Sequence, residues 1–131
     1  MALQRDMKLL LIEDDEHVAQ VLGEAFASDG HETAICHSGE AGLAYLAREH
    51  VDAVVLDIRL PVLNGVAVLR QVRSTNPTLP VIIMTGFATP GEIAEVRRLG
   101  VAEIIEKPEV LKHFGEALAR IERRGPPQDS T

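Results

Sequence analysis

The sequence has few of the residues on which several common functions depend. Its 131 residues include one cysteine, one tyrosine, three phenylalanines and no tryptophan. A single cysteine cannot form an intrachain disulfide or a cysteine-based zinc site, so we expect Cys36 to be a small buried hydrophobic residue. With so few aromatic side chains, the chain offers no platform on which nucleic-acid bases could stack.

Positive charge and long hydrophobic runs are scarce as well. The sequence has 13 Lys and Arg residues against 20 Asp and Glu residues, and the net charge of −7 repels nucleic-acid backbones and anionic lipids. The first apolar run, Leu9–Ile12, is too short for a signal peptide, and no later run approaches the roughly 18 residues of a membrane span. We therefore expect a cytoplasmic protein, and a segment that binds neither nucleic acid nor membrane directly.

The length and composition fit one globular domain. The hydrophobic and charged fractions, 46% and 25%, are typical of a chain that can bury a core. We expect an N-terminal extension at residues 1–7, one domain at residues 8–123, and a linker or disordered tail at residues 124–131. The tail is rich in Gly, Pro and polar residues, which do not support a packed element.

Short apolar runs predict the strands of a parallel sheet. They are Leu9–Ile12, Ala53–Leu56, Val81–Met84 and the pair Ile104 and Ile105. Near-continuous runs of Val, Ile and Leu are typical of strands covered on both faces, whereas a half-exposed strand would alternate. A weaker fifth strand, Glu32–His37, mixes polar and apolar residues and indicates a sheet edge.

Stretches with helical periodicity lie between these strands. The first has its apolar residues at Val18, Val21, Leu22, Ala25 and Phe26 and ends before Gly30. The others are Gly39–His50, Gly65–Ser74, Pro90–Leu99, with Thr89 as its N-cap, and Glu109 to about Arg123. This alternation predicts an α/β fold in which five helices cover both faces of a doubly wound, five-stranded parallel sheet.

Polar residues follow the apolar runs at the points where the strands end. They are Glu13, Asp14 and Asp15, then Asp57, Thr85 and Lys107. Because the carboxyl ends of parallel strands share one edge of a sheet, we expect these side chains to converge. Each also has an ordinary explanation: the first acids could cap a helix, Asp57 could be a loop residue, Thr85 a strand end and Lys107 a surface charge. Their joint placement favours a site.

A cluster of carboxylates indicates a metal site with phosphoryl chemistry. Two carboxylates about 4 Å apart repel each other by roughly 4 kcal/mol at an effective dielectric constant near 20. A divalent cation would offset this repulsion, and oxygen ligands favour a hard ion, Mg²⁺ more than Ca²⁺. A carboxylate beside such a metal can attack a phosphoryl group to form an acyl phosphate. Lys107 would neutralise one phosphoryl oxygen, and the Thr85 hydroxyl could donate to another.

The order of these residues matches a known motif set. It comprises the acid pair Glu13 and Asp14, the segment Asp57–Gly65, the Met84–Gly86 turn, and Lys107 with Pro108. Over about Lys8 to Arg123 the chain resembles the receiver domain of two-component response regulators. The resemblance implies the flavodoxin-like fold of chemotaxis receivers, with sheet order 2-1-3-4-5.

The resemblance also implies a role for each residue of the site. Asp57 would be the phosphoacceptor, assisted by Lys107 and Thr85, and Asp14 and Asp57 would bind Mg²⁺ directly. Glu13 would assist through water, and the backbone carbonyl of Arg59 would be a further metal ligand. The Lys107–Pro108 peptide bond is one that the family often holds in cis. The implied partners are a sensor histidine kinase or phosphotransfer protein and, at the fourth and fifth helices, an output domain or downstream protein.

One position departs from the family's usual switch residue, and two others lie where the family tunes access of hydrolytic water. Ile104 stands three residues before the lysine, where the family commonly has Tyr or Phe, which calls the usual aromatic coupling from Thr85 into question. Arg59 and Phe87 stand two residues beyond the acceptor and the threonine. We expect them to overhang the phosphoryl group and slow its loss.

Two other functions remain open from the sequence. One is a phosphorylation-independent interaction module, a pseudo-receiver, which the aliphatic Ile104 would suit. The other is a Mg²⁺-dependent phosphohydrolase. Such enzymes usually have a second Asp two residues after the nucleophile, where this chain has Arg59, so the hydrolase is the weaker alternative. We expect a switch with at most self-phosphorylation and self-dephosphorylation activity.

Overall fold

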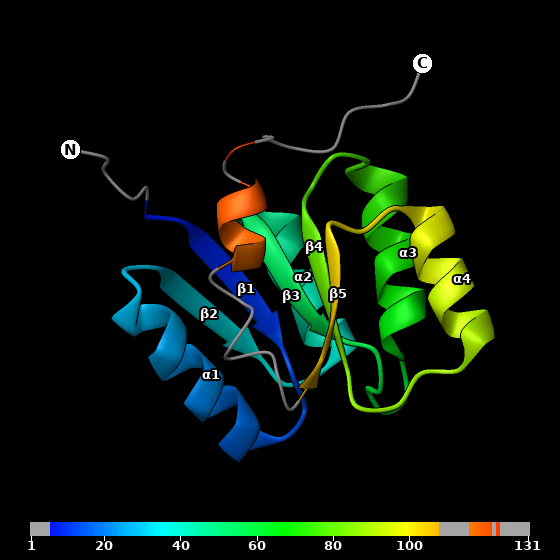
Figure 1. Ribbon diagram of the computed structural model, residues 1–131, viewed down its shortest axis with the longest axis horizontal. Helices are drawn as coiled ribbons and strands as arrows, with labels where there is room; N and C mark the ends of the chain where they lie inside the picture. The colour runs from blue at the N-terminus through cyan, green and yellow to red at the C-terminus, as the bar shows by residue number, and fades with distance from the viewer. Residues whose placement is uncertain (1–5, 108–115, 122, 124–131) are drawn as a thin grey trace.

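A parallel sheet forms the centre of the protein, seen in a computed structural model that describes residues 6–107, 116–121 and 123. Its strands are β1 (Lys8–Ile12), β2 (Glu32–Cys36), β3 (Ala53–Asp57), β4 (Val81–Thr85) and β5 (Glu103–Glu106). All neighbouring pairs are parallel, and the order across the sheet is β2-β1-β3-β4-β5 (Figure 1). The predicted fold and strand order are confirmed.

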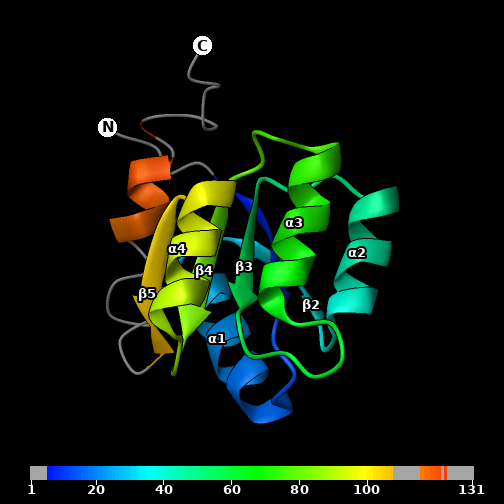
Figure 2. The same cartoon turned by 90° about the vertical axis from the view of Figure 1, so that its right-hand side faces the viewer.

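Helices cover both faces of this sheet. The complete ones are α1 (Glu16–Ser28), α2 (Gly39–Arg48), α3 (Gly65–Thr75) and α4 (Pro90–Leu99). Helices α2, α3 and α4 lie side by side on one face (Figure 2), and α1 with the helical residues 116–121 packs on the other. None of the described helices is long and apolar enough to cross a membrane.

The continuous apolar strands are explained by burial on both faces. Along β1, Leu9 and Leu11 pack into the core under α1, while Leu10 and Ile12 pack into the core under α2 and α3. Every residue of β3 and β4 is buried for the same reason. Strands buried on both sides have no polar face, so their sequences cannot alternate.

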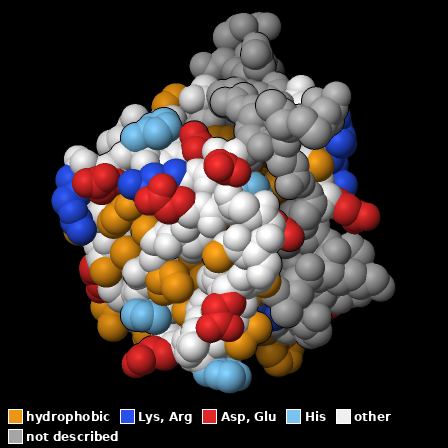
Figure 3. Space-filling model, turned by 90° about the vertical axis from the view of Figure 1, so that its left-hand side faces the viewer, with side chains coloured by type: hydrophobic (Ala, Val, Ile, Leu, Met, Phe, Trp, Pro, Cys, Tyr) orange, Lys and Arg blue, Asp and Glu red, His pale blue; other side chains and the backbone are white. Residues whose placement is uncertain are grey.

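Strand β2 is an edge strand, as predicted. Glu32 and Ile35 are exposed along it. Cys36, predicted to be buried, is only half-buried beside the core because its strand lies at the edge of the sheet. On the side of the molecule that carries α1 and β2, hydrophobic side chains are interspersed with acidic and histidine side chains (Figure 3). Val21, predicted to face inward, is 39% exposed, because α1 sits beside this edge and packs through Ala19, Leu22 and Phe26.

Each complete helix begins with a side-chain cap, which fixes the point where the preceding loop ends and the helix starts. The N-caps are Asp15, Ser38, Asn64 and Thr89, and each accepts a hydrogen bond from a backbone N–H of its helix. Thr89 is the predicted cap of α4, and with Glu92 it forms a complete capping box. Helix α2 ends at Arg48, two residues before the predicted end.

Some predictions fall outside the described residues. Residues 116–121 and 123 are helical, but the predicted start of the fifth helix at Glu109 is not described. The same holds for the Lys107–Pro108 bond and for the predicted tail at residues 124–131. At the other end Met7 is buried, and its N–H donates to His31 Nδ1 over 3.2 Å, so the packed core extends to this residue.

Candidate functional site

The residues predicted to converge do meet at the carboxyl edge of the sheet. Glu13 follows β1, Asp57 ends β3, Thr85 ends β4, and Lys107 directly follows β5. The Lys107 ammonium lies 2.9 Å from Glu13 Oε1 and 2.9 Å from Asp57 Oδ2. Residues almost a hundred positions apart in the chain thus form one ionic cluster.

Burial gives this cluster unusual electrostatics. Glu13 and Asp57 are 0% and 1% exposed, whereas Asp14 is exposed at the rim. Burial raises the pKa of the Glu13 carboxyl, although the Asp15 N–H and the Lys107 ammonium both oppose this shift. Burial alone would lower the pKa of Lys107, but the neighbouring Asp57 and Glu13 carboxylates outweigh it, so that pKa is raised. The lysine is therefore a persistent cation at neutral pH.

The carboxyl group of Asp57 is held from two sides. Its Oδ1 accepts a hydrogen bond from the Arg59 N–H at 3.0 Å, and its Oδ2 faces Lys107. Gly65 lets α3 begin directly against this strand end, because a Cβ there would lie 2.5 Å from the Asp57 carbonyl oxygen. Between them, Val62 has a φ of 64°, a strained value for a β-branched residue, and is 95% exposed. Asp57 thus ends its strand directly against the start of α3.

The acidic residues fit a hard divalent cation. One carboxylate oxygen from each of Glu13, Asp14 and Asp57 lies within 4.8 Å of the others. Glu13 Oε1 and Asp57 Oδ2 are buried and, within the described part of the chain, accept no aligned hydrogen bond. Buried oxygens of this kind require a cation, and Lys107 fills only one side of them. An all-oxygen set that opens to solvent at Asp14 suits Mg²⁺, which retains several waters.

Asp15 lies next to this cluster but has a different task. Its Oδ1 accepts from the Val18 N–H at 3.0 Å and caps α1, and this bond lowers the pKa of its carboxyl. Its N–H donates to Glu13 Oε2 at 3.0 Å. The capping explanation thus holds for Asp15, whereas Glu13 and Asp14 belong to the acidic cluster.

Two further contacts fix Glu13 and were not predicted. The Glu13 N–H donates to the Cys36 carbonyl at 3.0 Å, and the Glu13 carbonyl lies 3.0 Å from His37 Nδ1. His37 is exposed, and its ring nitrogen contacts the main chain of the acidic residue. Only the pairing of β1 with β2 brings it there, and a single sequence carries no signal for that contact.

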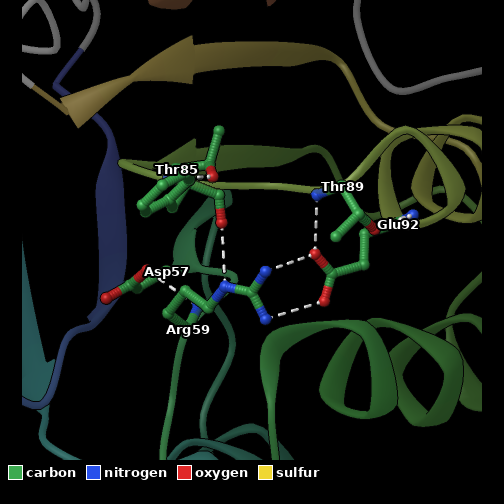
Figure 4. A network of polar contacts seen from close by, with 6 residues as sticks. Asp57, Arg59, Thr85, Thr89 and Glu92 are labelled. Atoms are coloured by element: carbon green, nitrogen blue, oxygen red, sulfur yellow. Dashed lines mark hydrogen bonds and ion pairs between the residues drawn. The ribbon is translucent and has the colours of Figure 1, made fainter.

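The Thr85 hydroxyl and the Arg59 guanidinium are engaged in contacts that lead away from Asp57. The Thr85 hydroxyl oxygen accepts from the Phe87 N–H at 3.1 Å. The Arg59 guanidinium donates to the Phe87 carbonyl at 2.8 Å and pairs with both carboxylate oxygens of Glu92, at 2.7 and 2.9 Å (Figure 4). The prediction that the Arg59 side chain overhangs the acceptor is therefore wrong for this state of the protein, because Glu92 draws the guanidinium toward α4.

Glu92 is thus a contact of the site that the sequence interpretation missed. Its signal was present in the capping box Thr89-x-x-Glu92, which identifies the carboxylate as an N-terminal group of α4. The pairing with Arg59, 33 residues earlier, depends on the tertiary fold. Phe87, predicted to cover the pocket, is 81% exposed and contributes its backbone to the network.

Comparison with protein families and relatives agrees with this geometry. The family model of the response regulator receiver domain matches residues 9–119. Regulatory protein AtoC of Escherichia coli (strain K12) is 35% identical over 101 residues, which make up 77% of this chain and 22% of AtoC. Response regulator MprA of Mycobacterium avium (strain 104) is 30% identical over 123 residues, 94% of this chain and 54% of MprA. The chain therefore spans about half the length of MprA and less than a quarter of the length of AtoC.

Solved structures give the same result. A response regulator receiver domain protein from Clostridium thermocellum matches with a TM-score of 0.83 and 26% identity, over 89% of this chain and 94% of that one. A CheY-like receiver domain protein from Methanospirillum hungatei JF-1 has a TM-score of 0.82 and 22% identity, over 92% of this chain and all of that one. The second likeness shows the fold alone.

Proposed function

The chain belongs to the response regulator receiver domain family, and we propose that it carries a phosphoryl group on Asp57 as a signalling switch. The family is a switch family and not one of classical enzymes. The observation that carries the proposal is the placement of the Lys107 ammonium, 2.9 Å from both Asp57 and Glu13. A cation fixed beside the buried acceptor carboxylate can neutralise the charge that a phosphoryl group brings.

The proposed reaction is a single group transfer. An Asp57 carboxylate oxygen attacks the phosphorus of a phosphohistidine, a P–O bond forms, and the N–P bond breaks with its electron pair leaving on the imidazole nitrogen. The product is an acyl phosphate on Asp57 and a free histidine on the donor. Lys107 faces Asp57 Oδ2 and would pair with one phosphoryl oxygen, while the Arg59 N–H holds Oδ1 and so orients the carboxyl group.

A metal ion completes this proposal. Glu13, Asp14, Asp57 and the backbone carbonyl of Arg59 would hold Mg²⁺, with Glu13 acting through water. The ion supplies positive charge for the phosphoryl oxygens. Three acidic side chains within 4.8 Å of one another support this assignment. The position of the Arg59 main chain next to Asp57, fixed by their hydrogen bond, is compatible with a carbonyl ligand from the same residue.

The partners follow from the relatives and from the chain's length. We infer that a sensor histidine kinase or a phosphotransfer protein is the donor, and that the fourth and fifth helix face reports to an output domain or downstream protein. The matched relatives are named response regulators and regulatory proteins, and they are longer than this chain. The location we propose is the cytoplasm.

Acetyl phosphate offers a direct test, because it supplies the phosphoryl group without a kinase. With Mg²⁺ present, intact-mass spectrometry is expected to show one addition of roughly 80 Da. The variant Asp57→Asn should lose it, and Asp14→Asn should lose most of it. Asp15→Asn is the matched control, because Asn also caps helices and Asp15 lies outside the cluster.

The outcomes separate the three functions. A stable addition on the wild type and on Asp15→Asn supports the switch. Continuous release of inorganic phosphate without an accumulating adduct would indicate a hydrolase instead. If the wild type gains no mass and releases no phosphate, the chain is a phosphorylation-independent interaction module, and the proposal is wrong.

A further inference from the structure

Arginine side chains from the β3–α3 loop and from α3 hold helix α4 along its length, in addition to its apolar contacts at Val96 and Leu99. Val96 is its one buried residue, whereas α3 buries three apolar side chains. Arg59 pairs with Glu92 in the first turn, Arg70 with Glu95 in the middle, and Arg73 donates to the carbonyls of Leu99 and Gly100 at the end. Because each exposed ion pair contributes only about 0–1 kcal/mol, a competing anion can displace one of these pairs at little cost in free energy.

The first of these contacts is the most elaborate. The Arg59 guanidinium forms a two-point pair with Glu92, and its Nε donates to the Phe87 carbonyl at 2.8 Å. Glu92 Oε1 also accepts from the Thr89 N–H at 2.9 Å, which makes the same carboxylate part of the helix cap. One side chain from the β3–α3 loop thus holds both the β4–α4 loop and the first turn of α4 (Figure 4).

This contact is linked directly to the proposed acceptor. The Arg59 N–H donates to Asp57 Oδ1, and Thr85 Oγ accepts from the Phe87 N–H. Both backbone polar groups of Phe87 are therefore hydrogen-bonded. Its N–H donates to Thr85, and its carbonyl accepts from Arg59. A continuous chain of hydrogen bonds therefore runs from Asp57 through Arg59 and Phe87 to Thr85. The ion pair between Arg59 and Glu92 connects this chain to α4.

We propose that Arg59 is a positioning residue that latches α4 while Asp57 is unmodified, and that phosphorylation opens the latch. This inference rests on the proposed function. A phosphoryl group on Asp57 adds negative charge and strong acceptor oxygens two residues from Arg59. Its side chain is 48% exposed, so the guanidinium can exchange the Glu92 carboxylate for the phosphoryl oxygens, which accept the same two-point pairing.

The latch gives this chain a route that needs no aromatic switch residue. Ile104 packs half-buried against the core and has no polar tip with which to follow a movement of Thr85. Arg59 instead couples the charge on Asp57 to the helix through competition between two anions. Release of Glu92 would leave the capping box of α4 intact but free its first turn and the Phe87 carbonyl from the β3–α3 loop.

The test is amide hydrogen exchange along α4, measured on the full chain with and without acetyl phosphate and Mg²⁺. Glu92→Gln removes the charge but keeps an oxygen that can accept from Thr89, so the cap survives. Glu95→Gln is the matched control, because it makes the same change one turn later and breaks pairs that do not involve Arg59. The intact mass of each sample reports how much Asp57 is modified.

Phosphorylation of the wild type should raise exchange at the amides of residues 93–96 by roughly twofold to fivefold, the range expected for loss of an exposed ion pair. In Glu92→Gln the same amides should already exchange at the faster rate before Asp57 is phosphorylated, and phosphorylation should not increase this rate further. Glu95→Gln should keep the full phosphorylation-dependent rise. Arg59→Gln should behave like Glu92→Gln.

Two results would overturn the latch alone: added mass on the wild type with unchanged exchange in α4, or a full rise that persists in Glu92→Gln. Absence of the added mass would instead overturn the proposed function, and the latch with it. Because mass and exchange are read on the same samples, the two failures are distinguished.

Discussion

The acceptor pocket and helix α4 are neighbours, but different forces hold them. In the pocket, Glu13 and Asp57 are completely buried beside Lys107, and β3 and β4 beneath them are buried throughout. Helix α4 buries Val96 completely and Leu99 partly, and arginine contacts at the surface add to this packing. A buried aliphatic side chain contributes about 1.5–3 kcal/mol, against about 0–1 kcal/mol for an exposed ion pair. The fold therefore combines a deeply buried site with a helix that has fewer buried contacts.

The largest difference in stability between the two regions is expected when a glycine in each is replaced by alanine, which adds one methyl group. In Gly65→Ala the new Cβ would lie 2.5 Å from the Asp57 carbonyl oxygen and 2.6 Å from Ile58 Cα, backbone atoms that cannot easily move. We expect a loss of about 2–3 kcal/mol in the free energy of unfolding, measured by urea denaturation.

Gly91→Ala provides the matching change in α4. There the nearest atom to a new Cβ is Thr89 Oγ at 3.9 Å, an ordinary contact, and Ala is a better helix former than Gly. This variant should be as stable as the wild type or more so. Equal losses for the two variants would show that the pocket and α4 are equally constrained.

The next largest effect is expected at the apolar anchor of α4. Val96→Ala removes two methyl groups from a side chain that is 0% exposed, which should lower the free energy of unfolding by about 1–2 kcal/mol. Amides along α4 should lose protection before those of β3 and β4 in hydrogen exchange. Uniform loss of protection across the domain would mean that α4 is not a separately released element.

Magnesium should act on the pocket and not on α4. Its binding offsets the repulsion among Glu13, Asp14 and Asp57, and at a few times its Kd it should stabilise the protein by about 1 kcal/mol. The thermal midpoint is expected to rise in the wild type and in Glu92→Gln. The rise should disappear in Asp14→Asn; a rise that persists there would argue against a metal at these carboxylates.

The smallest predicted effect is a pH dependence in α4. Hydrogen bonds and charges from Arg98 and Arg70 lower the pKa of Glu95 below its ordinary value of 4.5. The charged Glu95 carboxylate therefore stabilises the folded state fully at pH values above its ordinary pKa. This stabilisation is lost as the pH falls through the lower pKa that Glu95 has in the folded state. The difference in stability between wild type and Glu95→Gln should therefore shrink below about pH 4.5. If this difference in stability grew on acidification, the pKa of Glu95 would be raised by folding and not lowered, and the prediction would be wrong.

The fold could be read from the sequence because its strongest signal is burial. Strands covered on both faces require continuous apolar runs, and the runs at β1, β3 and β4 were found within one residue. The misplaced residues are Asp57 and Thr85, which end β3 and β4 but were predicted to follow them. Strand pairing uses the backbone, so a polar side chain at the end of a strand does not terminate it: Asp57 is registered with Met84 and Thr85 with Glu106.

The meeting of the site residues could also be predicted, but the direction of their side chains could not. Convergence of Glu13, Asp57 and Lys107 follows from the topology of a parallel sheet. The orientation of Arg59 depends on which acceptor lies within reach of a long, flexible side chain. Glu92 and the Phe87 carbonyl reach that position only through the packing of α4, so the sequence favoured the nearer Asp57 and was wrong.

The central claim is that Asp57 carries the phosphoryl group, and reductive mapping tests it most directly. After treatment with acetyl phosphate and Mg²⁺, borohydride reduction converts an aspartyl phosphate to homoserine, which peptide mass spectrometry locates in the sequence. We expect homoserine at position 57 in the wild type and in Asp15→Asn. It should be absent from Lys107→Ala, where the ammonium beside the acceptor is missing. Homoserine at Asp14 or at any other acid, with Asp57 unchanged, would contradict it.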